Sequence, residues 1–251
     1  MVRELTLVDD MRGCEKLERN IWGLNDAEVL PASHLVAAAH AGGMVAGAFD
    51  GDELVGFVCG FASYRPEWLR PNGLHSHMLG VLPSYQGKGI GRSLKAFQRT
   101  WCLERGLSWV TWTFDPLQAK NARLNLEHLG VTVSEYRVNE YGTLGGDLNA
   151  ELLTDRLLAF WSLTEAKDTP VLEPKDFPKA LTRSADNRPE KTFVSAAQLF
   201  VEVPTNFTQL MQENPSLALE WRLAAREVFL HYFELGYRAT QFVDHAYLLE
   251  E

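Results

Sequence analysis

The chain has 251 residues, a formal net charge of −9 and a hydrophobic content of 46%. This length suits one large domain or two small ones with a sizeable core, and the acidic charge argues against nucleic acid as a partner. No apolar run approaches the roughly eighteen residues of a membrane span, and residues 1–5 show no signal segment, so we expect no membrane partner. Cys14, Cys59 and Cys102 lack any metal-ligand spacing, which favours a cytoplasmic protein without a metal.

The first 163 residues predict a chain of mixed strands and helices. Two apolar runs, 44–49 and 53–62, flank Asp50-Gly51-Asp52, and Asp-Gly between such runs is a strong hairpin signal. We expect helices from Asp9 or Asp10 to about Ile21, from Pro31 to about His40, and over 91–105 and 118–129. We expect further strands over 3–8, 74–81, 108–114, 131–138 and 156–163.

The last part of the chain has a different composition. Residues 164–195 are polar and contain four prolines, which predicts a linker or an extended wrapping segment. Residues 196–251 predict a strand over 200–203, a helix over 216–235 and a strand over 238–243. The expected domains are therefore 1–163, a linker at 164–195, and a strand-helix-strand extension at 196–251.

A glycine-rich loop precedes the helix predicted at 91–105, and we call residues 86–93 the glycine loop. Its residues are Gln86, Gly87, Lys88, Gly89, Ile90, Gly91, Arg92 and Ser93. Such a loop at a helix start directs several backbone N–H groups toward one point, where the helix dipole also favours negative charge. The pattern predicts a cradle for a pyrophosphate. It lacks the Lys-Ser/Thr ending of a Walker A loop and the G-x-G-x-x-G spacing of a Rossmann fingerprint.

The sequence around this loop resembles a known signature. The run from Leu79 to Gly91, LGVLPSYQGKGIG, resembles the acetyl-CoA motif of the GNAT acetyltransferase superfamily. A second motif is similar too, because Asn121 opens a helix that ends in Leu129-Gly130 before another strand. The resemblance covers about residues 1–150.

The resemblance implies an α/β GNAT fold, in which helices flank a mixed, mostly antiparallel and splayed central sheet; here a C-terminal α/β extension follows. It also implies acetyl-CoA as the co-substrate, with no metal. The residues implied to bind it are Leu79, Gly80 and Val81 of the preceding strand, the glycine loop, and Asn121.

Two histidines lie in the strand before the loop, in Leu74-His75-Ser76-His77-Met78. Side chains two apart share a face of a strand, and imidazole suits the acceptance of an amine proton near neutral pH. The placement is similar to that in arylalkylamine N-acetyltransferases, where the pair lies in the acceptor channel. This implies that His75 and His77 are catalytic. The alternative is a half-buried pair bonded to its neighbours.

The usual acid of the family is missing from its expected position. GNAT enzymes carry a Tyr four residues before the Gly that ends the Asn-bearing helix, and here that position is Leu126. Tyr136 and Tyr141 are other candidates, whereas core packing is the favoured role of Tyr232. Asp115 is expected to cap the following helix, with the binding of a cationic acceptor as the alternative.

The resemblance predicts an acyl-CoA-dependent N-acyltransferase. The expected reaction moves acetyl from acetyl-CoA to a primary amine of a small molecule or amino acid, by direct attack in a ternary complex. The histidine pair favours this enzyme. The alternative is a non-catalytic CoA-binding module with a regulatory or interaction role, which Leu126 favours. A homodimer built with the tail is a further expectation.

Overall fold

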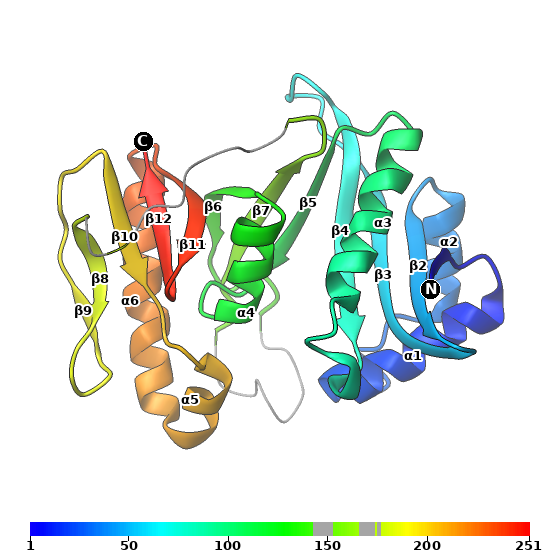
Figure 1. Ribbon diagram of the computed structural model, residues 1–251, viewed down its shortest axis with the longest axis horizontal. Helices are drawn as coiled ribbons and strands as arrows, with labels where there is room; N and C mark the ends of the chain where they lie inside the picture. The colour runs from blue at the N-terminus through cyan, green and yellow to red at the C-terminus, as the bar shows by residue number, and fades with distance from the viewer. Residues whose placement is uncertain (143–152, 166–173, 175–176) are drawn as a thin grey trace. The chain divides into compact units, whose positions relative to one another are not determined.

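The structure is a computed structural model that describes residues 1–142, 153–165, 174 and 177–251 (Figure 1). The chain divides into two compact units, and each is described by itself. Of the described residues, unit 1 holds Met1–Trp112 and Ser162–Glu165, and unit 2 holds the others. The predicted domain boundary after residue 163 is based on family resemblance, whereas the two units are defined by compactness. The boundary therefore stays a prediction.

Unit 1 is built on the sheet order β1-β2-β3-β4-β5. Neighbouring strands are antiparallel, except that β4 and β5 are parallel. The strands are β1 (Val2–Glu4), β2 (Met44–Asp50), β3 (Glu53–Tyr64), β4 (Asn72–Val81) and β5 (Trp109–Phe114), whose last two residues belong to unit 2. The predicted hairpin is confirmed, because β2 and β3 pair across a turn in which Gly51 has a φ of 57°.

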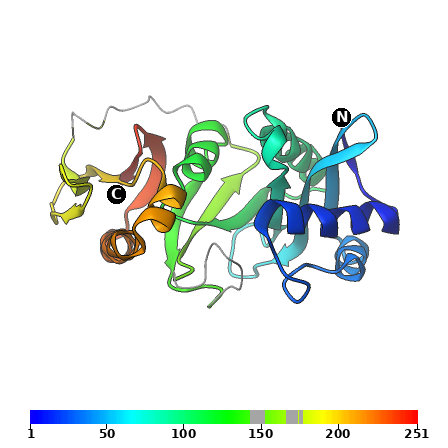
Figure 2. The ribbon, with the colours of Figure 1, turned by 90° about the horizontal axis from the view of Figure 1, so that it is seen from below.

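Helices cover both faces of this sheet (Figure 2). The helices α1 (Val8–Trp22) and α2 (Ala32–His40) lie on one face, and α3 (Ile90–Glu104) lies on the other. The core under α1 and α2 includes Cys14, Leu17, Phe57 and Cys59. Its packing excludes side chains at some positions, because a Cβ on Gly80 would lie 2.8 Å from both Ile21 and Trp22.

The start of the chain differs from its prediction. The strand expected over 3–8 ends at Glu4, and α1 already begins at Val8, with Leu7 as its N-cap. Asp9 and Asp10 therefore lie in the first turn instead of capping the helix. Carboxylates are favoured there by the helix dipole, so the same residues suit either helix start.

A β-bulge interrupts β4 in the segment that carries the histidines. Ser76 pairs with Gly60 and Met78 pairs with Cys59, so His77 is the extra residue. A bulge reverses the alternation of side chains beyond it. Leu79 consequently points toward α3, where it lies 3.7 Å from a Cβ placed on Gly91.

The strands β4 and β5 pair over a short distance only. Their paired residues are Leu74 with Val110 and His75 with Thr111. Along the rest of β4, from Ser76 to Val81, the structure gives no pairing with β5. This divergence is the splay of the predicted mixed, mostly antiparallel GNAT sheet, and the fold prediction is confirmed.

Unit 2 has the strand order β7-β6-β11-β12-β10-β8-β9, antiparallel apart from the β10–β8 pair. Its strands are β6 (Thr132–Arg137), β7 (Arg156–Ser162), β8 (Lys179–Arg183), β9 (Pro189–Lys191), β10 (Gln198–Glu202), β11 (Arg238–Val243) and β12 (Ala246–Glu250). The helices are α4 (Ala119–Ala122), which continues as the π-helical η2 (Arg123–His128), α5 (Phe207–Glu213) and α6 (Pro215–Glu234).

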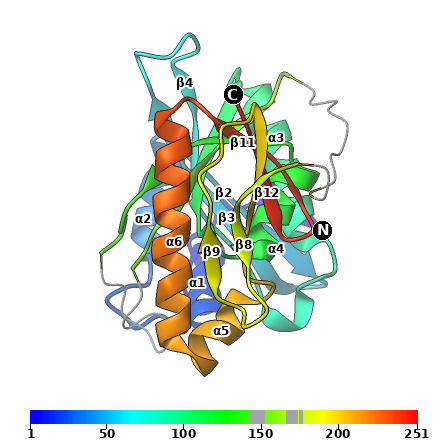
Figure 3. The same cartoon turned by 90° about the vertical axis from the view of Figure 1, so that its left-hand side faces the viewer.

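The helix α6 packs against β6, β8 and β9 through a buried face that includes Trp221, Val228, Phe229 and Tyr232 (Figure 3). The strands β8 and β9 lie within 164–195 and extend the sheet, so this part of the segment predicted as a linker or extended wrapping segment contains two strands. Pro178 and Pro189 argued against strands in this segment at the level of sequence. The strand β9 is an edge strand, where proline is tolerated, and Pro178 directly precedes β8.

Candidate active site

The glycine loop has the backbone conformation of an anion cradle. Gly87 and Gly89 have φ values of 77° and 81°, a region that glycine adopts without strain. Gly89 is the N-cap of α3, and the first backbone bond of the helix runs from Ser93 N to Gly89 O over 3.0 Å. The N–H groups of Ile90, Gly91 and Arg92 precede that bond and have no acceptor within the helix.

The loop is anchored and offers positive charge. Gln86 Nε2 donates to Val81 O over 3.2 Å, which fixes the loop to the end of β4. Lys88 Nζ lies 4.6 Å from the centroid of the Tyr85 ring, and Arg92 is exposed. A Cβ on Gly87 or Gly89 would meet nothing within 4 Å, so the loop stays open to a ligand. These residues fit a pyrophosphate.

The three predicted residues of β4 face different ways. Leu79 and Val81 lie on the α3 side, since Val81 is within 3.3 Å of a Cβ placed on the paired Gly56, which in turn neighbours Ile90 of α3. Gly80 faces α1. Close packing on α1 therefore accounts for glycine at position 80, and its contact with a cofactor stays a prediction.

The two histidines lie on the opposite face from α3. His75 pairs in register with Phe61, and the His77 ring lies 5.2 Å from the Phe61 ring. Phe61 shares its face of β3 with Cys59, which packs in the core under α1. Both imidazoles are therefore next to Phe61, close to the point where β4 and β5 diverge.

Neighbouring protein groups fix the orientation of the His75 ring and lower the pKa of His77. His75 Nδ1 lies 3.1 Å from Thr111 Oγ1, a contact that fixes the ring orientation. His77 is exposed, yet the protein atoms around its ring remove enough water to lower its pKa below the ordinary 6.5. The sequence pattern had no signal for Phe61 or Thr111, which belong to neighbouring strands.

Asn121 lies in unit 2, so its position is described within that unit alone. It is an exposed residue of α4, and its backbone N–H donates to Gln118 O over 2.9 Å. The helix continues as a π-helical segment, a feature that is frequent at functional sites. The cofactor contact predicted for Asn121 stays a prediction.

The residue at the usual acid position and two of the three tyrosines considered as acids are buried. Leu126, at the usual Tyr position, is 3% exposed. Tyr136 is buried and donates to Asp155 over 2.7 Å, and burial followed by this carboxylate raises the pKa of the phenol well above 10. The Tyr232 hydroxyl bonds the backbone of Val194, as expected of a core residue. Tyr141 alone of these tyrosines is exposed, and its hydroxyl lies 2.7 Å from Thr113 Oγ1.

Asp115 is not available to an acceptor. Its Oδ1 accepts from Leu117 N over 2.9 Å in the turn before α4, whose N-cap is Gln118, so Asp115 does not cap the helix as the sequence predicted. Both carboxylate oxygens also accept from the Arg222 guanidinium, at 2.7 and 2.6 Å. The sequence had no signal for this pairing, because 107 residues separate the partners.

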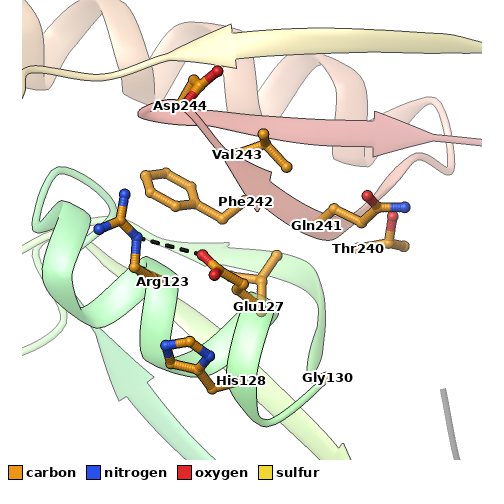
Figure 4. A pocket seen from close by; sticks show the side chains of 10 residues that line it. Arg123, Glu127, His128, Gly130, Thr240, Gln241, Phe242, Val243 and Asp244 are labelled. Atoms are coloured by element: carbon orange, nitrogen blue, oxygen red, sulfur yellow. Dashed lines mark ion pairs between the residues drawn. The ribbon is translucent and has the colours of Figure 1, made fainter. Parts of the chain in front are cut away.

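Unit 2 contains a pocket of about 560 Å³ between η2 and β11 (Figure 4). Glu127 and His128 are exposed there, and Arg123 Nε pairs with Glu127 over 3.3 Å. Thr240, Phe242 and Asp244 form the other wall. The lining mixes both signs of charge and contains none of the predicted site residues, so we do not assign it to acetyl transfer.

The family model that matches the chain agrees with these observations. Residues 12–130 match the acetyltransferase (GNAT) family. This segment, just under half of the chain, belongs to the GNAT acetyltransferase family. Its enzymes use acetyl-CoA, and the glycine loop lies inside the matched residues. A comparison with curated protein sequences gives no match.

Solved structures show the same GNAT fold. A ribosomal-protein alanine N-acetyltransferase from Escherichia coli is 16% identical with a TM-score of 0.51, covering 68% of this chain and 99% of its own. A putative GNAT acetyltransferase from Desulfovibrio desulfuricans is 17% identical with a TM-score of 0.51, covering 65% and 99%. An aminoglycoside 6'-acetyltransferase type Ii is 18% identical with a TM-score of 0.50, covering 66% and 99%. In the described part of this GNAT chain, no helix is long and apolar enough to cross a membrane.

Proposed function

We propose that this GNAT enzyme transfers acetyl from acetyl-CoA to the primary amine of a small molecule or amino acid, by direct attack in a ternary complex. The observation that carries the proposal is the placement of His75 and His77 on one face of β4, beside the splay from β5. A base is needed at this point because the attacking amine must lose a proton.

The glycine loop supports the cofactor side of the proposal. Its unpaired N–H groups at the start of α3, together with Lys88 and Arg92, would hold the pyrophosphate of acetyl-CoA. Leu79 and Val81, on the same side of β4 as α3, would run beside the pantetheine arm. Asn121 would add one contact.

The contact between His75 and Thr111 supports the assignment of the base. If His75 Nδ1 donates to Thr111 Oγ1, the imidazole lone pair is on Nε2, the tautomer that accepts a proton from an amine. In the reaction, the amine nitrogen bonds the acetyl carbon and the carbon–sulfur bond breaks. The histidine takes the amine proton, and the CoA thiolate receives a proton from water. We assign no side chain as the acid.

The acceptor class follows from charge and from the relatives. The net charge of −9 favours a cationic or neutral acceptor over a polyanion. Two relatives are named for amine acceptors, an alanine and an aminoglycoside. The buried free thiols of Cys14, Cys59 and Cys102 fit a reaction in the cytoplasm.

A second candidate is a CoA-binding module without catalysis, which the buried Leu126 favours. Both candidates are tested by measuring thiol release from acetyl-CoA with and without a panel of amines and amino acids. The enzyme is expected to release thiol faster with at least one amine and to yield the acetylated product. CoA binding by calorimetry without amine-dependent release would instead support the module.

A further inference from the structure

The helix that follows the glycine loop carries a fully buried amine. Lys95 is 3% exposed, and its Nζ lies 3.1 Å from Ser76 Oγ and 2.9 Å from Gln98 Oε1. It also lies 3.6 Å from the centroid of the Trp112 ring. No carboxylate of the described residues forms an ion pair with it. A buried lysine without a counter-ion is rare, because burial penalises the charge.

The groups around Lys95 can bond either protonation state of its amine. Burial lowers its pKa to about 7. In the structure Nζ donates to Ser76 Oγ and to Gln98 Oε1 and lies over the Trp112 ring. In the uncharged amine, one N–H would donate to Gln98, a second would face the ring, and the lone pair would accept the Ser76 hydroxyl proton. Gln98 Nε2 donates to Ser76 Oγ over 3.2 Å, so each of these polar groups has a partner.

Protonation of Lys95 changes this arrangement at one residue. A charged amine has no lone pair, so it donates to Ser76 Oγ, as Gln98 does already. The Ser76 hydroxyl proton must then turn to another acceptor. Ser76 lies between His75 and His77 in β4, at the bulge. The protonation state of Lys95 is therefore transmitted to the segment that carries the histidines.

The helix α3 packs against β1, β2, β3 and β4, and the charged groups of the first three strands have partners other than Lys95. Arg3 binds Asp10, Glu4 binds Trp101 and Arg105, and Asp50 and Glu53 bind Tyr85. On α3 itself the neighbouring ionisable group is Cys102, whose thiol pKa is raised to about 12 by burial. From β4 and β5 the facing residues are Ser76 and Trp112, whereas His75 and His77 point to the other face. Lys95 is five residues from the start of α3, and helix side chains lean toward the N-terminus.

A pyrophosphate held by the loop is therefore the strongest charge that ligand binding brings toward Lys95. It would lie on the order of 10 Å away, given the rise of about 1.5 Å per helical residue. Two negative charges at that distance raise an amine pKa by about one unit or more at an effective dielectric constant of roughly 20–40.

We propose that binding of CoA to the glycine loop is coupled to the uptake of a proton by Lys95, and that this proton reorients Ser76 between the two histidines. Lys95 acts here as a positioning residue. The inference rests on the proposed function only in assuming that the loop holds the CoA pyrophosphate.

Calorimetric titration with CoA at pH 8 tests the coupling. Repeating it in Tris and in HEPES, which differ in ionisation heat, gives the number of protons taken up. We expect an uptake of roughly 0.4 proton or more for the wild type and none for Lys95→Met. The exposed Lys16→Met is the control and should match the wild type. The ionisable groups of CoA contribute equally to the proton uptake of the wild type and of both variants. The difference in proton uptake between the wild type and Lys95→Met therefore reports on Lys95.

A second measurement uses only wild-type protein, so it tests the coupling even if Lys95→Met does not fold. In wild-type protein with isotope-labelled lysine, the Lys95 Cε shift should titrate near pH 7 and move to higher pH when CoA is added. Equal proton uptake in wild type and Lys95→Met, or a Lys95 titration that CoA leaves unchanged, would overturn the coupling while CoA binding stands. A wild type that does not bind CoA would overturn the loop assignment and the coupling together.

Discussion

The imidazoles of His75 and His77 are the residues on which catalysis depends in our proposal. The double change His75→Gln with His77→Gln should lower kcat by about 10²–10⁴, the usual contribution of a general base. A single change can be offset by the neighbouring ring. CoA affinity should persist, because the glycine loop is on the α3 side of the sheet. The exposed His34→Gln is a matched control.

The direction in which the wild-type rate changes with pH is a further prediction. The neutral imidazole is the active form, so the rate falls as pH falls through the histidine pKa. With His77 as the base, the acidic limb of kcat/KM should lie below pH 6.5, because the protein atoms around its ring lower its pKa. A double variant that retains both its rate and its acidic limb would assign the pair to structure alone.

Asn121 offers a separate test on the other compact unit. Asn121→Ala should raise KM for acetyl-CoA about two- to tenfold with a smaller effect on kcat, because one hydrogen bond contributes about 0.5–1.5 kcal/mol. Lys120→Ala, at the neighbouring exposed position, is the control. An unchanged KM would leave Asn121 as an ordinary residue at the start of α4.

At the scale of elements, the glycine loop can be tested against an equally strained glycine. Gly89→Glu should abolish CoA binding, because it brings a side chain and a negative charge to the cradle. The chain should still fold, since a Cβ there meets nothing within 4 Å. Gly106, beyond the other end of α3, has a φ of 72° and equally open surroundings, so Gly106→Glu matches the backbone strain. Calorimetry should show CoA binding for Gly106→Glu and not for Gly89→Glu.

Most elements of unit 1 could be predicted from sequence, because their signals are local. The Asp50-Gly51 turn and the glycine loop each depend on a few neighbouring residues. The bulge at His77 could not be predicted in this way, since it is defined only by the pairing of β4 with β3. The same holds for Lys95, whose partners Ser76 and Trp112 lie on two different strands.

In unit 2 the sequence predicted α6, β10 and β11 but not what holds them. Arg222 and Arg226 are one helical turn apart, and each binds a carboxylate far away in the chain, Asp115 and Asp155. Ion pairs across such separations leave no periodic pattern in the sequence. Leu126 was identified correctly as a departure from the family, but the tyrosines proposed in its place could be sorted only by their partners.

At the scale of the whole molecule, the Asp155–Arg226 pair should dominate the stability of unit 2. Asp155 is fully buried and accepts two bonds of 2.8 Å from Arg226. Removing one partner of a buried pair costs about 3–5 kcal/mol. Arg226→Met should therefore lower the free energy of unfolding by about that amount in urea titrations. Asp155→Asn, which leaves the more exposed arginine, should cost less.

The same variant has a predicted pH signature. Burial raises the pKa of Asp155, but the bonds from Arg226, Tyr136 and Asn139 N–H outweigh it and lower the pKa. In the wild type this stabilisation is present above the unfolded pKa and is lost as pH falls through the folded pKa. Without Arg226, burial dominates and favours the protonated acid. The stability gap between wild type and Arg226→Met should thus narrow toward pH 4, whereas a constant gap would place the loss in packing.

The two arginine–carboxylate pairs also bear on how the protein is made. A ribosome releases Asp115 and Asp155 well before Arg222 and Arg226, since translation proceeds from the N-terminus. Until α6 has been synthesised, Asp115 and Asp155 have no arginine partner. Burial of these unpaired carboxylates is unfavourable, so they stay hydrated. The part of unit 2 that precedes α6 must therefore wait for the last thirty or so residues before both ion pairs can form. A nascent chain paused before α6 would be the species most exposed to chaperones and proteases.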